Sequence, residues 1–176
     1  MNTANKLTML RVALIPVFLI LLYLRFPFHM YFALTVFILA SVTDFVDGYI
    51  ARHYNQVTDF GKFMDPLADK VLVMAALLWF VEAGRLPAWV LLVVIVREFA
   101  VTALRLIAVE RGRVIAAAWS GKVKTASTMV CICLMLFIAR PALDLVCAAV
   151  ILVTTVYSGM RFYLCEGPVD MRKGIL

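Results

Sequence analysis

Two aspartates share one side of a predicted helix with two small residues. On an α-helix, four residues of the stretch DFVDGYIAR fall within an arc of about 100°: Asp44, Asp47, Gly48 and Ala51. Small side chains beside carboxylates let a nucleotide lie against the helix backbone. Arg52, at the end of this stretch, could hold a phosphate.

A second acidic stripe follows after a short connection. Gly61, Asp65 and Asp69 repeat at intervals of four residues. A tight turn around residues 53–60 would make the two helices antiparallel neighbours, so that both stripes could face one cavity. Four carboxylates in one place repel one another unless cations bind or protons neutralise them. All-carboxylate ligation suits hard cations, so we predict Mg²⁺ or Mn²⁺, with two ions as the usual arrangement for phosphoryl displacement.

The alternative is that these aspartates are separate helix caps on a cytoplasmic loop. It is open for Asp65, which precedes Pro66 and could cap a helix that begins there. It does not account for Asp44 and Asp47, which follow a long and mostly apolar run.

Two further polar clusters come later in the chain, and both are basic. They comprise Arg97, Glu98, Thr102 and Arg105, then Lys122, Lys124 and Thr125. Several cations that face inward imply a polyanionic ligand, most simply one that carries a phosphate. Ordinary flanking charge is the alternative for Lys122 and Lys124. It is weaker for Arg97 and Arg105, because arginine inside a span is costly and Glu98 can pair with only one of them.

Six apolar stretches must position these residues. They lie at 8–24, 28–54, 66–82, 87–110, 119–139 and 142–164. The chain has 176 residues, of which 65% are hydrophobic, and a mean hydropathy of +0.99. A membrane-spanning helix needs about 20 mainly apolar residues and pairs its own backbone groups. The sequence therefore predicts a single all-α integral membrane domain over residues 1–176, with six transmembrane helices.

The basic residues are divided unequally between the two sides of this predicted bundle. Of 17 Lys and Arg, only Arg25, Arg85 and Arg140 fall in or beside the connections at 25–28, 82–87 and 139–142. The positive-inside rule places the other side, with both termini, in the cytoplasm. We therefore expect a multi-pass protein of a bacterial-type cell membrane, with its active site on the cytoplasmic side. Its basic rim is expected to meet anionic lipid rather than nucleic acid.

The combined pattern, D-x-x-D-G-x-x-A-R, eight residues, then G-x-x-x-D-x-x-x-D, resembles the signature of the CDP-alcohol phosphotransferases at every fixed position. The resemblance implies a six-helix membrane enzyme, usually a homodimer, that cuts a CDP-linked alcohol at its pyrophosphate. It implies two divalent metals held by Asp44, Asp47, Asp65 and Asp69. It also implies that Asp69 is the general base for the incoming hydroxyl.

The same resemblance outlines a binding site for the CDP moiety. Its members in the signature are Gly48, Ala51, Arg52 and Gly61. The segment NKLTMLR is similar to the family's N-terminal element, which adds Asn5, Thr8 and Arg11. Thr8 and Arg11 could equally cap and anchor the first helix.

The basic clusters, with DFVDGYIAR and DPLADK, resemble the branch of this family that makes phosphatidylglycerophosphate, from Asn5 to about Tyr163. This implies transfer of a phosphatidyl group from CDP-diacylglycerol to the primary hydroxyl of glycerol 3-phosphate, with release of CMP. The residues implied for the acceptor phosphate are Arg97, Arg105, Lys122, Lys124 and Thr125. Arg161 could join them, although snorkelling to lipid headgroups suits it better.

Three other functions compete with this interpretation. The same chemistry could use another acceptor, such as inositol phosphate, which would need a similar anion pocket. A membrane prenyltransferase also binds pyrophosphate through aspartate and Mg²⁺, but the D-G-x-x-A-R element argues against it. A cation transporter is a remote alternative, because the outer halves of the predicted helices are nearly all apolar.

Overall fold

The computed structural model describes residues 3–24, 26–53, 59–110 and 119–166, and within them the side chains of 9–24, 26–43, 67–68, 70–108 and 119–164. The regular structure in these ranges is entirely helical. In chain order the helices are α1 (Thr3–Tyr23), α2 (His29–His53), α3 (Asp59–Glu82), α4 (Ala88–Glu110), α5 (Trp119–Phe137) and α6 (Pro141–Glu166). The prediction of an all-α fold is therefore confirmed, and the described residues form six helices, as many as the predicted spans.

Two helices begin earlier than their apolar runs. α1 begins at Thr3 rather than at residue 8, and α3 begins at Asp59 rather than at residue 66. Apolar runs mark only the part of a helix that lies in a core or in lipid. A prediction from hydropathy is therefore too short for a helix whose first turns are polar. Asp65 is consequently inside α3 and is not the cap of a helix that begins at Pro66. Thr8 and Arg11 are likewise inside α1 and do not cap it.

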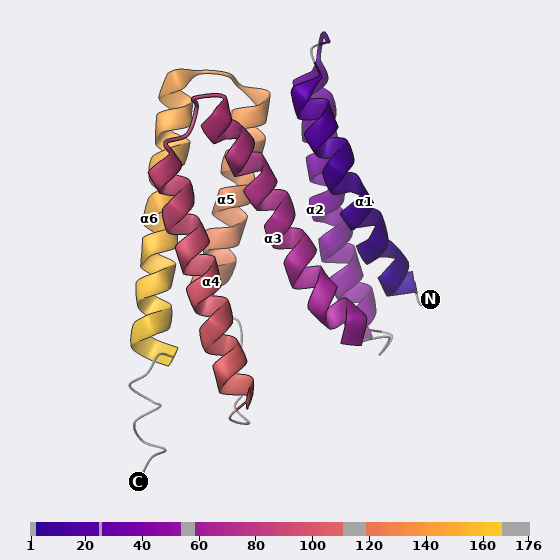
Figure 1. Cartoon of the computed structure of the whole chain (residues 1–176), viewed down its shortest axis with the longest axis vertical. Coiled ribbons are helices and arrows are strands. Elements are labelled where there is room, and N and C mark those ends of the chain that lie inside the picture. The colour runs from indigo at the N-terminus through magenta and orange to yellow at the C-terminus, as the bar shows by residue number, and fades with distance from the viewer. Residues whose placement is uncertain (1–2, 25, 54–58, 111–118, 167–176) are drawn as a thin grey trace.

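The six helices alternate in direction along the bundle (Figure 1). The start of α1 and the end of α6 lie at one end, which we call the terminal end; the connections at 24–28, 83–87 and 138–140 lie at the other, the connection end. α3 runs obliquely between the α1–α2 pair and the group α4–α6, and it contacts α1, α2, α4 and α5. α3 thus joins the two halves of the molecule, together with α2, which contacts α5 directly.

A glycine sets the sharp end of α3. Gly84 has a φ of +68°, a conformation that residues with a side chain rarely adopt. Its N–H donates to the carbonyl of Val81 at 3.0 Å, and the N–H of Arg85 donates to that of Phe80 at 2.9 Å. These two bonds form a Schellman motif, which satisfies the last carbonyls of the helix and turns the chain into α4.

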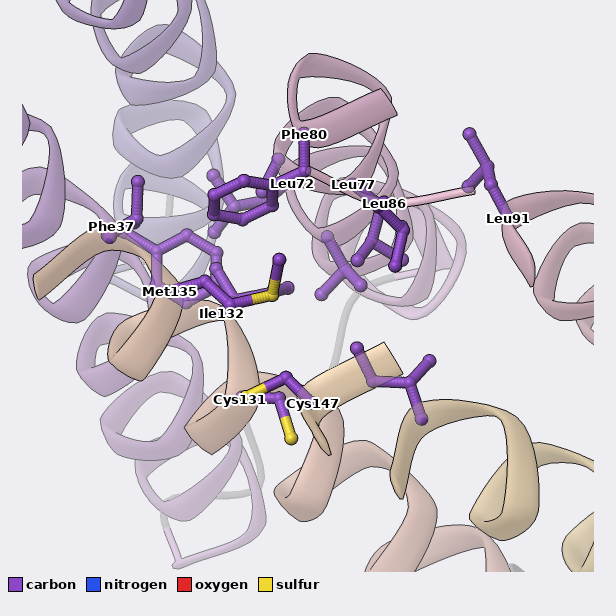
Figure 2. Close-up of a cluster of buried hydrophobic side chains, with 14 of the residues drawn as sticks. Phe37, Leu72, Leu77, Phe80, Leu86, Leu91, Cys131, Ile132, Met135 and Cys147 are labelled. Atoms are coloured by element: carbon purple, nitrogen blue, oxygen red, sulfur yellow. The ribbon is translucent and has the colours of Figure 1, made fainter. Parts of the chain in front are cut away.

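The core lies where α1 to α6 meet in the middle of the bundle (Figure 2). Phe37 of α2, Phe80 of α3 and Met135 of α5 are almost completely buried there. The outside of the helices is apolar as well. Large side chains that are each at least 43% exposed include Ile20, Ile38, Leu78, Leu92, Val130 and Val153. Apolar surface on so many helices is unusual for a soluble protein and suits a lipid surrounding.

Within the described residues, two helices are long and apolar enough to cross a membrane, at Trp119–Phe137 and Pro141–Leu164. Shorter apolar helical runs occupy Met9–Tyr23 and His29–Thr43. α4 is also long, but it carries Arg97, Glu98 and Arg105. These features agree with a membrane-associated protein. The number of spans and the side that each terminus faces stay predictions.

Candidate active site

The backbone brings the two acidic stripes to the same end of the bundle. Residues 44–52 form the last turns of α2, and residues 61–69 belong to the first turns of α3. α2 and α3 contact each other, and both segments lie at the terminal end (Figure 1). Because both segments are helical, the predicted spacings of three and four residues do place each pair of aspartates on one helix face.

The side chains of ten predicted site residues lie outside the described ones. They are Asn5, Thr8, Asp44, Asp47, Gly48, Ala51, Arg52, Gly61, Asp65 and Asp69. The metal site and most of the CDP site therefore stay predictions. The chemistry of the donor set fits the proposed ions, since four carboxylates on two neighbouring helices are ligands that Mg²⁺ and Mn²⁺ prefer.

Arg11 is the one predicted CDP-binding residue whose side chain the structure describes. It is completely buried, among the largest side chains in the interior. A buried arginine in an apolar helix is costly unless other groups of the protein or a ligand stabilise it. Its position inside the bundle is consistent with a role in a polar site and differs from that of a helix-end anchor.

The two basic clusters meet in one cavity. This cavity has a volume of about 720 Å³, lies between α2, α3, α4 and α5, and contains all five residues predicted for the acceptor phosphate: Arg97, Arg105, Lys122, Lys124 and Thr125. It is also lined by Lys70, Glu98 and Thr102. The described lining holds five cations and one carboxylate, so the cavity carries a large excess of positive charge.

Glu98 is the centre of the cation cluster. Its Oε1 accepts hydrogen bonds from Arg97 Nη1 at 2.8 Å and from Lys124 Nζ at 2.9 Å. Lys70 Nζ lies 3.8 Å from Oε2. The prediction that Glu98 can pair with only one arginine agrees with these contacts, since Arg97 is its arginine partner. One carboxylate with 14% exposure thus holds together cations of α3, α4 and α5.

Lys70 is a cavity residue that the sequence did not assign. Its Nζ donates to the hydroxyl of Thr102 at 2.5 Å, and that hydroxyl donates to the backbone carbonyl of Glu98 at 2.7 Å. Lys70 directly follows Asp69 in α3, so the acceptor cavity begins one residue after the predicted general base. A charge within an apolar run, next to a motif aspartate, was the available signal.

Arg97 crosses from α4 to α6. Its Nη2 donates to the hydroxyl of Ser158, which is completely buried, at 2.6 Å. Gly121 and Gly159 flank its path, because a Cβ added to either would lie 3.6 Å and 3.4 Å from Arg97 atoms. Within the described residues its Nε is buried without a hydrogen-bond partner. Ser158 has no sequence signal, since it is one of several hydroxyl residues in a mostly apolar helix.

Arg105 and Arg161 have different surroundings. The guanidinium of Arg105 lies 5.7 Å from the ring centre of Phe162, and its Nε is buried without a hydrogen-bond partner in the described part of the chain. Arg161 is exposed, donates to the hydroxyl of Tyr157 at 3.2 Å and does not line the cavity. Only Arg105 is thus placed to meet a ligand in the cavity.

Comparisons with known proteins connect this site to a family. The model of the family described as CDP-alcohol phosphatidyltransferase matches residues 1–160. Two similar proteins are named CDP-diacylglycerol--glycerol-3-phosphate 3-phosphatidyltransferase. One, from Bacillus subtilis (strain 168), is 46% identical over 148 residues, which cover 77% of this chain and 76% of that protein. The other, from Shigella flexneri serotype 5b (strain 8401), is 37% identical over 177 residues and 97% of each chain.

A third relative, from Mycobacterium tuberculosis (strain ATCC 25618 / H37Rv), is named Probable phosphatidylglycerophosphate synthase. It is 45% identical over 127 residues, or 70% of this chain and 60% of that protein. The family match extends over both acidic stripes and all the cavity residues. This chain belongs to the CDP-alcohol phosphatidyltransferase family.

Proposed function

We propose that this protein transfers the phosphatidyl group of CDP-diacylglycerol to the primary hydroxyl of glycerol 3-phosphate, giving phosphatidylglycerophosphate and CMP. Relatives that match this chain over most or all of its length carry the name of this activity. The observation that carries the choice of acceptor is the cavity, whose described lining holds five cations and one carboxylate. An acceptor with a phosphate uses this charge, whereas serine or an uncharged alcohol would not.

The donor is assigned to the terminal ends of α2 and α3. We assign two divalent cations, Mg²⁺ or Mn²⁺, to the four motif aspartates. The CDP moiety is assigned to Gly48, Ala51, Arg52 and Gly61, with Asn5, Thr8 and Arg11 from α1. When bound, such cations offset the charge of the pyrophosphate and of the departing CMP.

The acceptor's phosphate is held by the cavity while its hydroxyl reaches the donor. Asp69 takes the proton of that hydroxyl as its oxygen bonds to the phosphatidyl phosphorus. The bond from this phosphorus to the CMP oxygen breaks, and CMP leaves with the electron pair. Lys70 lines the cavity and directly follows Asp69 in α3, so this part of α3 borders the cavity.

We place the protein in a cell membrane of the bacterial inner-membrane type, with six spans, both termini in the cytoplasm and the active site at the cytoplasmic surface. The apolar exterior of the helices and the location of the basic residues at the terminal end support this orientation. A homodimer is proposed from the family resemblance. Diacylglycerol tails remain in lipid in this arrangement while the polar groups meet water.

The test is CMP release by the purified protein with CDP-diacylglycerol and Mg²⁺, after addition of glycerol 3-phosphate, inositol phosphate or serine. We expect release only with glycerol 3-phosphate. Asp69→Asn should abolish it, whereas Asp59→Asn, an acidic residue of the same helix outside the motif, should retain it. Release with inositol phosphate instead would keep the donor chemistry and overturn the acceptor. A folded protein that binds divalent cations but releases no CMP would favour a cation transporter.

A further inference from the structure

Both arginines in the described lining of the cavity are contacted by a helix that does not line it. α4 and α6 contact each other and run side by side in the same direction (Figure 1). Ser158 of α6 contacts Arg97, and Phe162, one turn later, lies against Arg105. None of the described residues that line the cavity belongs to α6. α6 therefore contacts both guanidiniums without reaching the cavity itself.

The contact with Ser158 orients the guanidinium of Arg97. Nη2 donates to the Ser158 hydroxyl at 2.6 Å, and Nη1 donates to Glu98 Oε1 at 2.8 Å. The guanidinium is planar, so hydrogen bonds at two of its nitrogens define the orientation of that plane. Arginine commonly binds phosphate through two N–H groups at once, which requires that the plane faces the ligand. The hydroxyl thus controls the geometry on which a bidentate phosphate contact depends.

The packing around Arg97 is close. Its side chain is 12% exposed, and Ser158 is completely buried. The backbones of α5 and α6 pass near it, since a Cβ at Gly121 would lie 3.6 Å from Nη2 and one at Gly159 would lie 3.4 Å from Cγ. Ser158 therefore offers a hydrogen-bond acceptor whose position is set by the packing of α6 against α4.

Ser158 is also a neutral partner, which distinguishes Arg97 from Arg85. The Arg85 guanidinium donates to both oxygens of Asp144, and that carboxylate supplies a counter-charge. The Ser158 hydroxyl accepts a hydrogen bond without supplying one. Since the described lining of the cavity holds five cations and one carboxylate, a neutral acceptor orients Arg97 and leaves the positive excess unchanged.

We propose that Ser158 is a positioning residue for the acceptor's phosphate and acts by orienting the Arg97 guanidinium. The proposal rests on the proposed function and adds to the acceptor site a residue outside the cavity lining. Ser158→Ala should raise the KM for glycerol 3-phosphate about five-fold, the usual effect of one hydrogen bond, because no added charge offsets the poorer orientation. The KM for CDP-diacylglycerol should stay within about two-fold of the parent value. A variant that merely folded less well would keep both KM values, because only folded molecules contribute to the rate.

Two comparisons separate positioning from a structural role. Thr154→Val, one turn earlier in α6, removes a hydroxyl that donates to its own helix at the Val150 carbonyl at 2.7 Å, and it should keep the parent KM. In Arg97→Met the residue through which Ser158 acts is gone, so adding Ser158→Ala should change the KM for glycerol 3-phosphate by less than about two-fold. An undiminished effect in that background, or an unchanged KM in Ser158→Ala alone, would overturn the proposal.

Binding measured without catalysis distinguishes failure of this proposal from failure of the proposed function. Calorimetric titration with glycerol 3-phosphate, in detergent and without the donor, should give a Kd about five-fold higher for Ser158→Ala than for the parent. An equal Kd in the two proteins, with CMP release by the parent, would retain the transferase and reject the role of Ser158. The same difference with inositol phosphate, in a parent that uses only that acceptor, would reject glycerol 3-phosphate and retain the role of Ser158.

Discussion

An arginine at the connection end of the bundle and an arginine in the cation-lined cavity both bind a carboxylate, yet their surroundings differ. Arg85 lies at the connection end and Arg97 in the cation-lined cavity, and their side chains are 15% and 12% exposed. Among the described side chains, Asp144 forms an ion pair with Arg85 alone. Arg97 shares Glu98 with Lys124 and Lys70. The difference separates an ion pair with a matched charge from a cluster with excess positive charge, which we propose binds a ligand.

The Arg85 site is complete. Its Nε and Nη2 donate to the two oxygens of Asp144, at 2.9 and 2.7 Å. Nη2 also donates to the carbonyls of Met135 and Ile138 at the end of α5, and the guanidinium lies 5.1 Å from the ring centre of Phe80. Charge and hydrogen bonds balance, so this site connects α3, α5 and α6 without need of a partner.

In the cavity around Arg97, neither charges nor hydrogen bonds are balanced among the described residues. Its cations outnumber its carboxylate, and the Nε atoms of Arg97 and Arg105 are buried without hydrogen-bond partners in the described part of the chain. Buried excess charge destabilises a protein unless a ligand compensates it. A local departure from the rules of stable packing is typical of a functional site.

The largest expected effect comes from breaking the ion pair between Arg85 and Asp144. Asp144→Asn should lower the free energy of unfolding by about 3–5 kcal/mol, because it leaves a buried guanidinium without its counter-charge. Activity per folded molecule should not change. Titration with a denaturing detergent measures the first quantity, and CMP release measures the second.

Two variants check the cause of that loss. Glu82→Gln removes an exposed acid at the same end, which accepts a hydrogen bond from Tyr23, and should have no measurable effect on stability. Replacing both partners, as Arg85→Met with Asp144→Leu, should recover most of the stability. If the double variant is no more stable than Asp144→Asn, loss of the ion pair is not the reason for the lower stability of Asp144→Asn.

Arg105→Met should impair activity and not stability, the reverse of Asp144→Asn. It removes a cation that has no carboxylate partner among the described residues, so the KM for glycerol 3-phosphate should rise about 100-fold, equivalent to about 2.7 kcal/mol. Stability should be unchanged or slightly higher, because methionine can pack against Phe162. Arg161→Met, outside the cavity, is the matched control and should keep the parent KM. A fall in stability without a change in KM would make Arg105 a structural residue.

Glu98→Gln should distinguish the effect of the cavity's charge from the effect of how its cations are positioned. It increases the positive excess of the cavity, so affinity for glycerol 3-phosphate should not fall. It also releases Lys70, Arg97 and Lys124 from their common partner, so kcat should fall about ten-fold through poorer orientation of the acceptor. Steady-state kinetics resolve the two constants. A higher KM at unchanged kcat would contradict the positioning role.

The smallest effect is expected from two buried threonines. Within the described residues, the Thr155 hydroxyl has no hydrogen-bond partner, whereas the Thr128 hydroxyl donates to the Lys124 carbonyl at 2.9 Å. Thr155→Val should therefore raise the free energy of unfolding by up to about 1 kcal/mol. Thr128→Val should lower it by about 1 kcal/mol. Equal effects of the two variants would indicate that Thr155 has a partner in solution.

Hydropathy and motif spacing in the sequence predicted much of this protein, and each error has a physical reason. Hydropathy located all six helices but began α1 and α3 late, because their first turns are polar. The cation pocket was predicted from arginines inside an apolar run, and its five residues do line one cavity. Lys70 was not assigned, although it is a charge beside a motif aspartate, and Ser158 was not assigned because neither its type nor its spacing distinguishes it from other residues of its helix.

The sequence by itself determined the helices, the end of the bundle that carries the polar residues and the chemistry of the donor and acceptor groups. These are local properties, because hydropathy, helical period and motif spacing depend on near neighbours in the chain. Only the tertiary structure decided which charges meet. Lys124 reaches Glu98 across 26 positions, Lys70 reaches Thr102 across 32, and Arg97 reaches Ser158 across 61. Such contacts result from how whole helices pack, which no local pattern specifies.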